Sequence, residues 1–312
     1  MNEHAAPSRR QWSRPLRGII PPLATPLTAR DRLDLAGLER LVERTISGGV
    51  HGLFVLGTTG EAAALSLRVR RELVERVVEQ VGGRVPVLVG VSDTSLAESL
   101  AAAEHAAEAG ADAVVATSPY YLPLEQPELF DFFRAIHDES PLPLYLYNMP
   151  GLTKTWISPE VIREAMQLPN VHGLKDSSGD LAYFREAAAE LHRRPDWSLL
   201  VGSELLMVDA LSLGGHGCVS GGANVHPRLF VDLYEAAVRA DQPAVERLQG
   251  QWNQLAVIYN DGQYGSCAIR GIKCGLALLG ICDERMATPF RPVRDEQRAV
   301  IAAALKELGL CS

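Results

Sequence analysis

The feature that most constrains the fold of this chain is a regular series of short apolar segments, rich in valine, isoleucine and leucine. Eight such segments recur, and their first residues lie 19 to 34 positions apart. Apolar residues run through each segment without polar alternation, which is typical of parallel strands covered on both faces. The eight predicted strands are residues 18–23, 52–56, 86–90, 113–116, 142–147, 172–175, 198–201 and 217–220.

Amphipathic segments separate these strands and predict helices. Apolar residues recur at helical spacing from Leu35 to Ile46 and from Leu73 to Val81, and an alanine-rich segment at 95–109 precedes a glycine. Eight strands that alternate with helices predict an α/β fold, a (β/α)8 TIM barrel. A doubly wound open sheet is the alternative, but no Gly-x-Gly-x-x-Gly turn follows the first strand.

Beyond residue 227 the sequence shows only helical periodicity, at 229–239, 244–259, 266–279 and 293–308. We therefore expect the chain to have three parts. These are a flexible N-terminal tail at 1–17, the barrel at 18–240 and a small C-terminal helical region at 241–312.

Composition excludes several classes of protein. The 312-residue chain has a formal net charge of −8 and a pI of about 5.5, so no nucleic-acid partner is expected. No apolar segment is long enough to span a membrane, and the polar N-terminus lacks the apolar part of a signal peptide. The five cysteines form no Cys-x-x-Cys pair, and the histidines show no zinc-binding spacing. We expect a cytoplasmic protein with reduced thiols and no metal.

The sixth predicted strand ends at Lys175, just before a run of small polar residues. In barrels of this kind, chemistry lies at the carboxyl ends of the strands and in the loops that follow. A buried ammonium group is costly unless it is paired or loses its proton, and an unprotonated lysine can form a Schiff base with a carbonyl substrate. This segment alone favours the simpler alternative, a surface lysine that extends to water.

A polar segment also follows the second predicted strand. Its sequence, Gly57-Thr58-Thr59-Gly60-Glu61, offers two hydroxyls and several backbone N–H groups that suit a carboxylate ligand. Thr58 and Glu61 also have the spacing of a helix capping box, which needs no ligand. The segment does not decide between these two interpretations.

Tyrosines mark the ends of the fourth and fifth strands. Tyr145 and Tyr147 face the barrel interior by strand alternation, and Tyr147 lies nearer the mouth. A tyrosine hydroxyl beside Lys175 can move protons during Schiff-base formation, although an aromatic residue that only fills the barrel is the alternative. Tyr121 follows the fourth strand and is a further candidate, for which packing is the simpler role.

The ends of the last two strands supply candidates for substrate binding. The glycine-rich loop of the eighth strand resembles the phosphate site of many barrels, although its glycines can simply let the backbone approach a substrate. The candidates are Gly202, Ser203, Glu204, Val219, Ser220 and Asn224.

Three of these segments resemble motifs of the dihydrodipicolinate synthase / N-acetylneuraminate lyase family. They are Gly57–Glu61, Tyr147-Asn148-Met149-Pro150 and Gly173-Leu174-Lys175, and the resemblance extends over nearly the whole chain from about residue 18. It implies a class I enzyme on a (β/α)8 barrel that forms a Schiff base with a pyruvate-type 2-oxo acid. It also implies a homo-oligomer, usually a homotetramer built as a dimer of dimers.

The resemblance implies a role for each matching residue. Lys175 matches the Schiff-base lysine, and Tyr147 matches the general acid/base. Thr58 and Thr59 match the pair that holds the substrate carboxylate, with Gly57 beside them. Tyr121 matches a second tyrosine that crosses a dimer interface and completes a proton relay with Tyr147 and Thr58.

Departures from the family pattern bear on the substrate. Synthases that join pyruvate to aspartate semialdehyde typically have an arginine where this chain has Leu152, and a leucine there resembles the aldolase branch. Sialic acid lyases contact the sugar through a serine where this chain has Gly221. Lys154 replaces a usual glycine, and it either contacts an acidic substrate group or faces solvent.

The sequence therefore predicts a class I lyase. Our first choice is the reversible aldol cleavage of a 2-keto-3-deoxy sugar acid to pyruvate and an aldehyde. The alternatives are a 4-hydroxy-tetrahydrodipicolinate (dihydrodipicolinate) synthase, a 2-keto-3-deoxy sugar acid dehydratase and, in a different class, a non-catalytic keto-acid-binding protein. No cofactor is expected, because the lysine imine itself accepts the electron pair.

Overall fold

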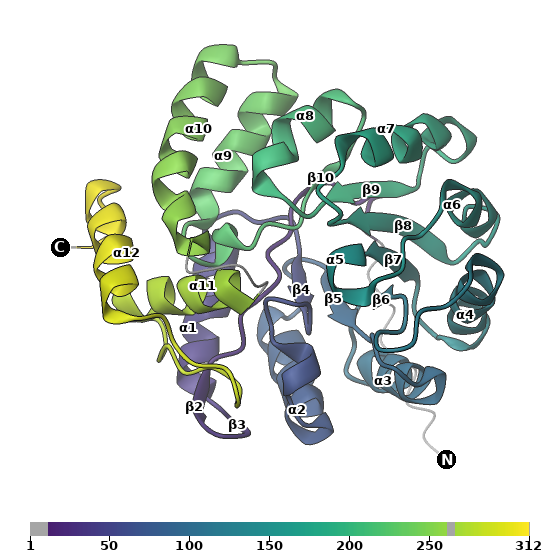
Figure 1. Ribbon diagram of the computed structural model, residues 1–312, viewed down its shortest axis with the longest axis horizontal. Helices are drawn as coiled ribbons and strands as arrows, with labels where there is room; N and C mark the ends of the chain where they lie inside the picture. The colour runs from purple at the N-terminus through teal and green to yellow at the C-terminus, as the bar shows by residue number, and fades with distance from the viewer. Residues whose placement is uncertain (1–11, 261–265, 312) are drawn as a thin grey trace.

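The computed structural model describes residues 12–260 and 266–311, which contain an eight-stranded parallel sheet. The strand order is β1-β10-β9-β8-β7-β6-β5-β4. Pro22 bridges to Phe54 of β4, and Leu23 donates its N–H to the Phe54 carbonyl at 2.8 Å, so the sheet closes into a barrel (Figure 1). The strands are β1 (Gly18–Ile19), β4 (Leu53–Val55), β5 (Val87–Gly90), β6 (Ala113–Thr117), β7 (Leu144–Asn148), β8 (Val171–Asp176), β9 (Ser198–Val201) and β10 (Gly217–Cys218).

Each of the eight predicted segments overlaps one of these strands, which confirms the barrel. The first strand is shorter than predicted because Pro21 and Pro22 have no N–H groups to donate to a ladder. A short antiparallel hairpin of β2 (Leu27–Ala29) and β3 (Arg32–Leu33) forms a separate sheet, which the apolar pattern does not predict.

Helices surround the barrel (Figure 1). The buried side chains form two layers. One layer lies between strands and helices, and the other, which includes Ile20, Phe54 and Tyr147, fills the barrel. Two apolar layers explain why each strand is apolar along its whole length. The surrounding helices are α1 (Leu35–Ser47), α2 (Leu67–Val81), α3 (Leu96–Glu108), α4 (Gln126–Glu139), α6 (Pro159–Ala165), α7 (Leu181–Ala189), α8 (Met207–Ser212) and α9 (Pro227–Val238).

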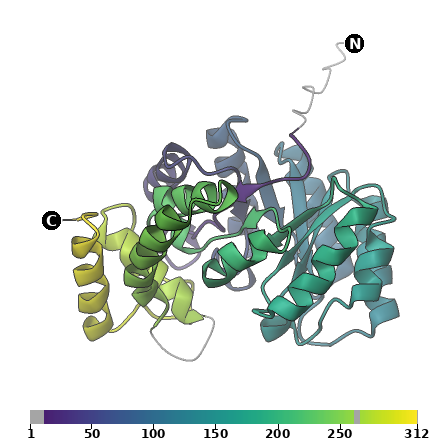
Figure 2. The ribbon, with the colours of Figure 1, turned by 90° about the horizontal axis from the view of Figure 1, so that it is seen from above.

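The C-terminal helices gather on one side of the barrel, as Figures 1 and 2 show. They are α10 (Gln242–Leu255), α11 (Ser266–Leu278) and α12 (Asp295–Glu307). A 3-10 turn, η5 (Ala256–Tyr259), follows α10 directly. Within the described residues, every helix is too short or too polar to cross a membrane.

The residues before β1 pack against the amino-terminal end of the barrel. The Trp12 indole donates to Asp112 at 2.8 Å, and the Leu16 N–H donates to the Ser198 hydroxyl at 2.8 Å. Leu16 is buried and joins the apolar layer inside the barrel. The expectation of a flexible tail at 1–17 is therefore wrong for residues 12–17, because Leu16 is buried with the side chains inside the barrel. Residues 1–11 lie outside the described residues.

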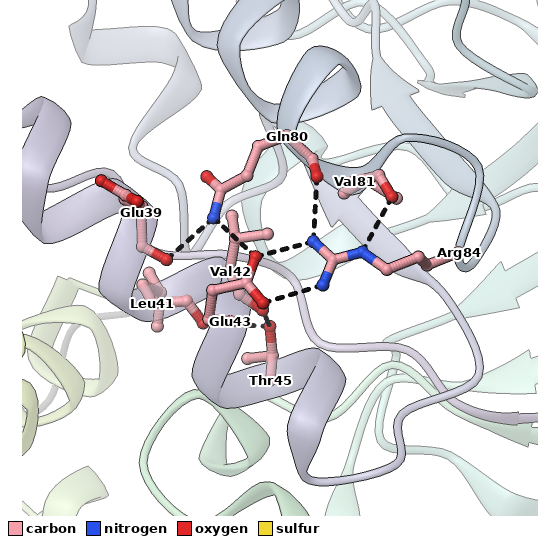
Figure 3. Close-up of polar contacts among 8 residues, drawn as sticks. All are labelled: Glu39, Leu41, Val42, Glu43, Thr45, Gln80, Val81 and Arg84. Atoms are coloured by element: carbon pink, nitrogen blue, oxygen red, sulfur yellow. Dashed lines mark hydrogen bonds and ion pairs between the residues drawn. The ribbon is translucent and has the colours of Figure 1, made fainter.

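A polar contact on the outer surface joins α1 to the end of α2 (Figure 3). Arg84 donates to both carboxylate oxygens of Glu43, at 2.8 and 2.7 Å, and Gln80 donates to the same carboxylate at 3.0 Å. The Arg84 hydrogen bonds are the main reason that the pKa of Glu43 lies at about 2. A bidentate charge pair thus joins α1 to the segment just after α2, and Gln80 joins α1 to α2 itself.

Candidate active site

Lys175 lies near the carboxyl end of β8, paired in register with Tyr147 on β7. It is only 6% exposed, so the surface-lysine alternative is wrong. Its amine nitrogen lies 3.4 Å from the centre of the Tyr147 ring and 5.8 Å from the centre of the Phe54 ring. Aromatic faces attract an ammonium at such distances, so the two rings hold the amine inside the barrel mouth.

Tyr147 is buried, yet its environment lowers its pKa. Burial alone raises the pKa of Tyr147, but the positive charge of Lys175 and the polar contacts of the hydroxyl outweigh burial. The pKa therefore lies below the ordinary value for tyrosine. A phenol with a lowered pKa takes up and releases protons more readily near neutral pH.

Ser177 is a site residue that the sequence analysis missed. The Lys175 amine donates to the Ser177 hydroxyl at 3.0 Å, and this hydroxyl also lowers the pKa of Tyr147. The Ser177 N–H donates to the Asn148 carbonyl at 2.9 Å, which fixes its backbone beside β7. A Cβ at position 202 would lie 1.8 Å from the Ser177 oxygen, so Gly202 makes room for this hydroxyl. The sequence does hold one signal for Ser177, which is its spacing from Lys175. Residues two apart in a strand face the same side, and Ser177 lies two residues beyond Lys175.

The loop after β4 brings Thr58 to the same place. The Thr58 hydroxyl lies 3.3 Å from the Tyr147 hydroxyl. Thr58 and Thr59 are partly exposed, whereas Gly57 is buried. The capping-box interpretation is wrong, because the Glu61 carboxylate turns away from Thr58 to the Ala287 N–H (2.7 Å) and Lys273.

A second pair of side chains supports the two strands just beyond Tyr147 and Lys175. Asn148 and Asp176 are paired in register, and the Asn148 amide donates to the Asp176 carboxylate at 2.8 Å. Burial raises the pKa of Asp176. The side-chain amide oxygen of Asn148 accepts the Ile157 N–H at 3.1 Å. The register of β7 and β8 is therefore held by side chains as well as by the backbone.

Glu204, predicted to bind substrate, is held by the protein itself. One oxygen of its buried carboxylate accepts hydrogen bonds from the Ser220 hydroxyl at 3.0 Å, the Gly222 N–H at 2.8 Å and the Tyr259 hydroxyl at 2.8 Å. Tyr259 comes from η5, so the C-terminal region contacts the barrel mouth here. Sequence spacing alone does not predict this partner.

The remaining predicted residues lie near the same edge in different settings. Val219 faces the barrel interior with Tyr147, and Ser203 is partly exposed after β9. Asn224 is buried: its oxygen accepts the Ala24 N–H at 3.0 Å, and its amide donates to the Pro22 and Gly221 carbonyls at 3.0 and 2.9 Å. Asn224 therefore ties the loop after β10 to the loop after β1.

Tyr121 lies apart from the site of its own chain. It follows β6 and is 90% exposed, with Leu122 beside it 71% exposed. Its backbone φ of +90° is a conformation that residues other than glycine rarely adopt. Within this single chain, Lys175, Tyr147 and Thr58 come together and Tyr121 does not.

This arrangement suits attack on a carbonyl carbon. A buried amine lies beside a phenol that can give or take a proton, and two hydroxyls adjoin them. Across residues 12–260 and 266–311, no three side chains of histidine, cysteine, aspartate or glutamate gather as a metal site.

Residues 15–308 match the Dihydrodipicolinate synthetase family. The chain belongs to this family. It is 37% identical over 294 residues to a 4-hydroxy-tetrahydrodipicolinate synthase of Phenylobacterium zucineum, covering 94% of this chain and 98% of that protein. It is 34% identical over 295 residues to an uncharacterized DapA-like lyase of Halobacterium salinarum, covering 95% of each. The protein is accordingly a lyase of the dihydrodipicolinate synthetase family.

Solved structures of the family share this fold. Dihydrodipicolinate synthase from Bacteroides thetaiotaomicron superimposes with a TM-score of 0.91 at 48% identity, covering 95% of this chain and all (100%) of that one. YagE, a prophage protein of the same family from E. coli K12, was solved in complex with pyruvate. It matches with a TM-score of 0.89 at 30% identity, covering 95% of this chain and 99% of its own.

Proposed function

We propose that Lys175 forms a Schiff base with a 2-oxo acid of the pyruvate type. The observation that carries this proposal is a buried lysine amine against the ring of Tyr147, whose pKa is lowered, on adjacent strands. Family membership and the pyruvate complex of YagE support the same class of substrate.

In this proposal the Lys175 nitrogen attacks the 2-carbonyl carbon while Thr58 and Thr59 hold the carboxylate. Both protons of the nitrogen pass in turn through Tyr147 to the former carbonyl oxygen, which leaves as water and gives the neutral imine. The Tyr147 hydroxyl then protonates the imine nitrogen. When the C3–C4 bond breaks, its electron pair moves to the protonated imine and Tyr147 accepts the proton of the C4 hydroxyl. The aldehyde leaves, C3 regains a proton, and hydrolysis releases pyruvate.

The preferred substrate is a 2-keto-3-deoxy sugar acid. Leu152, in the short helix α5 (Pro150–Thr153) after β7, is 47% exposed and offers no cation for the carboxylate of a second substrate. The exposed Lys154 donates its amine to the Gly151 carbonyl at 2.8 Å, which supports the solvent-facing alternative for this residue. Ser203 is a proposed contact for the distal hydroxyls. Glu204 is proposed to contact them through its other carboxylate oxygen, because Ser220, Gly222 and Tyr259 all donate to Oε1.

A second candidate is the condensation performed by a 4-hydroxy-tetrahydrodipicolinate synthase. The specific observation in its favour is that relatives of 37% and 48% identity carry that name. A dehydratase would use the same imine and break a carbon–oxygen bond instead. A binding protein would have the same pocket and no turnover.

We further propose a cytoplasmic homo-oligomer, a dimer of dimers, in which Tyr121 enters the site of a second copy. The large side chains of Tyr121 and Leu122 are both exposed beside the barrel mouth, which supports an interface there. Sedimentation equilibrium of the wild type and of Leu122→Asp tests this. A monomeric wild type would contradict the proposal.

Product analysis separates the candidate reactions. We expect pyruvate and an aldehyde to be released from a panel of 2-keto-3-deoxy sugar acids. Loss of water without pyruvate would instead indicate a dehydratase. Consumption of pyruvate with aspartate semialdehyde, at a rate above any cleavage, would indicate a synthase. Binding without any product would indicate a binding protein.

A further inference from the structure

A buried ion pair joins the C-terminal region to the loop that carries Thr58. We propose that Glu61 and Lys273 are positioning residues for the Schiff-base reaction. Their contact holds the loop after β4 so that the Thr58 hydroxyl meets the Tyr147 hydroxyl. This inference rests on the proposed function, because it concerns the same Lys175 imine.

The ion pair is closed off from solvent. Both side chains are 0% exposed, and the Lys273 amine contacts one oxygen of Glu61 directly. The amine also donates to the Arg285 carbonyl at 2.6 Å, and the second Glu61 oxygen accepts the Ala287 N–H at 2.7 Å. Each charge therefore has two partners within the protein, as a buried charge requires.

The backbone of the loop explains why an anchor is needed. Glu61 has a φ of +57° and Leu56 a φ of +60°, both in the left-handed region that side chains disfavour. These two residues bracket the glycine–threonine turn. The Glu61 N–H also donates to the Thr58 carbonyl at 3.0 Å. Such strain persists only where the surroundings hold it, and the carboxylate of Glu61 is held by two groups of the C-terminal region.

Stability alone does not account for this pair. Burial lowers the pKa of Lys273, and the Glu61 charge only opposes that effect. Apolar side chains of similar volume are often as stable as a buried ion pair. Positioning of the loop after β4 is a second reason for the ion pair. The Thr58 and Tyr147 hydroxyl oxygens lie 3.3 Å apart, which is long for a hydrogen bond between two hydroxyls. A small movement of the loop is therefore enough to make or break this contact.

A double-mutant cycle tests the coupling, with pyruvate as the probe. The rate of hydride-trapped adduct formation at Lys175 is measured for the wild type, Lys273→Met, Thr58→Val and the double variant. Misplacing a catalytic group by about 1 Å can cost as much as about a hundredfold, so we expect Lys273→Met to slow trapping about tenfold or more. In the Thr58→Val background the same change should cost less than about twofold. Equal losses in both backgrounds would overturn the positioning role.

Two further variants keep the test decisive. Glu61→Gln keeps the shape of the Glu61 side chain and removes its charge. If Lys273→Met does not fold, Glu61→Gln takes its place in the cycle. Arg298→Met removes another ion pair of the C-terminal region, with Glu284, and should leave trapping unchanged. An equal loss in Arg298→Met would overturn the proposal. A wild type that forms no adduct overturns the proposed function, whereas additive losses in an adduct-forming enzyme overturn only this inference.

Discussion

Tyr147 and Lys175 are register partners on β7 and β8, and the lysine amine lies 3.4 Å from the centre of the phenol ring. Strands that pair in parallel bring residues near their carboxyl ends together at one edge of the barrel. The two side chains are therefore positioned by two paired strands rather than by a loop. Burial raises the pKa of Tyr147, but the Lys175 charge and the polar contacts of the hydroxyl lower it below the ordinary value.

Tyr147→Phe removes the hydroxyl and keeps the ring against the Lys175 amine. General acid/base groups contribute about a hundredfold to ten-thousandfold, so we expect imine formation with pyruvate to slow by at least about a hundredfold. Pyruvate binding should change far less. Tyr145→Phe on the same strand is the matched control, and stopped-flow kinetics with pyruvate compares the two. Equal rates in both variants would contradict the assignment.

Ser177→Ala removes the acceptor of the Lys175 amine. A hydrogen bond to a charged group is worth roughly 1.5–3 kcal/mol, so we expect imine formation to slow about tenfold or more. Ser178→Ala makes the same chemical change at the next residue, whose hydroxyl donates to Asp176 at 3.0 Å instead. The same kinetics should distinguish the two alanines, and a wild-type rate in Ser177→Ala would exclude the contact from the reaction.

Leu152→Arg tests the substrate assignment. Leu152 is 47% exposed, so an arginine there has room, and its planar guanidinium suits a second carboxylate. We expect cleavage of 2-keto-3-deoxy sugar acids to fall and condensation of pyruvate with aspartate semialdehyde to rise. Leu152→Met is the control for side-chain length. A wild type that already condenses these substrates efficiently would show that Leu152 is no barrier to synthase activity.

Glu43 should make stability depend on pH. Its pKa in the folded protein is about 2, below the ordinary 4.5, so its contribution is present above pH 4.5 and is lost as the pH falls toward 2. Glu43 and Arg84 are 46% and 42% exposed, so we expect Glu43→Gln to cost less than about 1 kcal/mol at pH 7. Urea unfolding from pH 7 to pH 3 measures the difference, with Glu39→Gln on α1 as control. A difference that stays constant over this range would contradict the prediction.

The barrel and the central pair are predictable from sequence because both follow from local patterns. Each strand is a continuous apolar run, and Lys175 and Tyr147 stand near the ends of consecutive runs. The polar composition of residues 1–17 predicts a loose tail, but this segment also contains the apolar side chain of Leu16. Leu16 occupies a buried site at the amino-terminal end of the barrel, and hydrogen bonds from Trp12 to Asp112 and from the Leu16 N–H to Ser198 add to this packing.

Long-range polar contacts are the part that the sequence does not predict. Glu61 has the local spacing of a cap, yet its partners Lys273 and Ala287 lie in the C-terminal region. Glu204 likewise meets Tyr259, far along the chain. Side-chain hydrogen bonds between distant segments have no periodicity, so only the folded backbone shows them.

Hydride trapping with pyruvate, followed by peptide mass mapping, is the most direct test of the proposed Schiff base on Lys175. The chain contains four lysines: Lys154, Lys175, Lys273 and Lys306. We predict one reduced pyruvyl adduct, on Lys175, and none in Lys175→Ala. The absence of an adduct, or an adduct only on one of the other three lysines, would contradict this prediction.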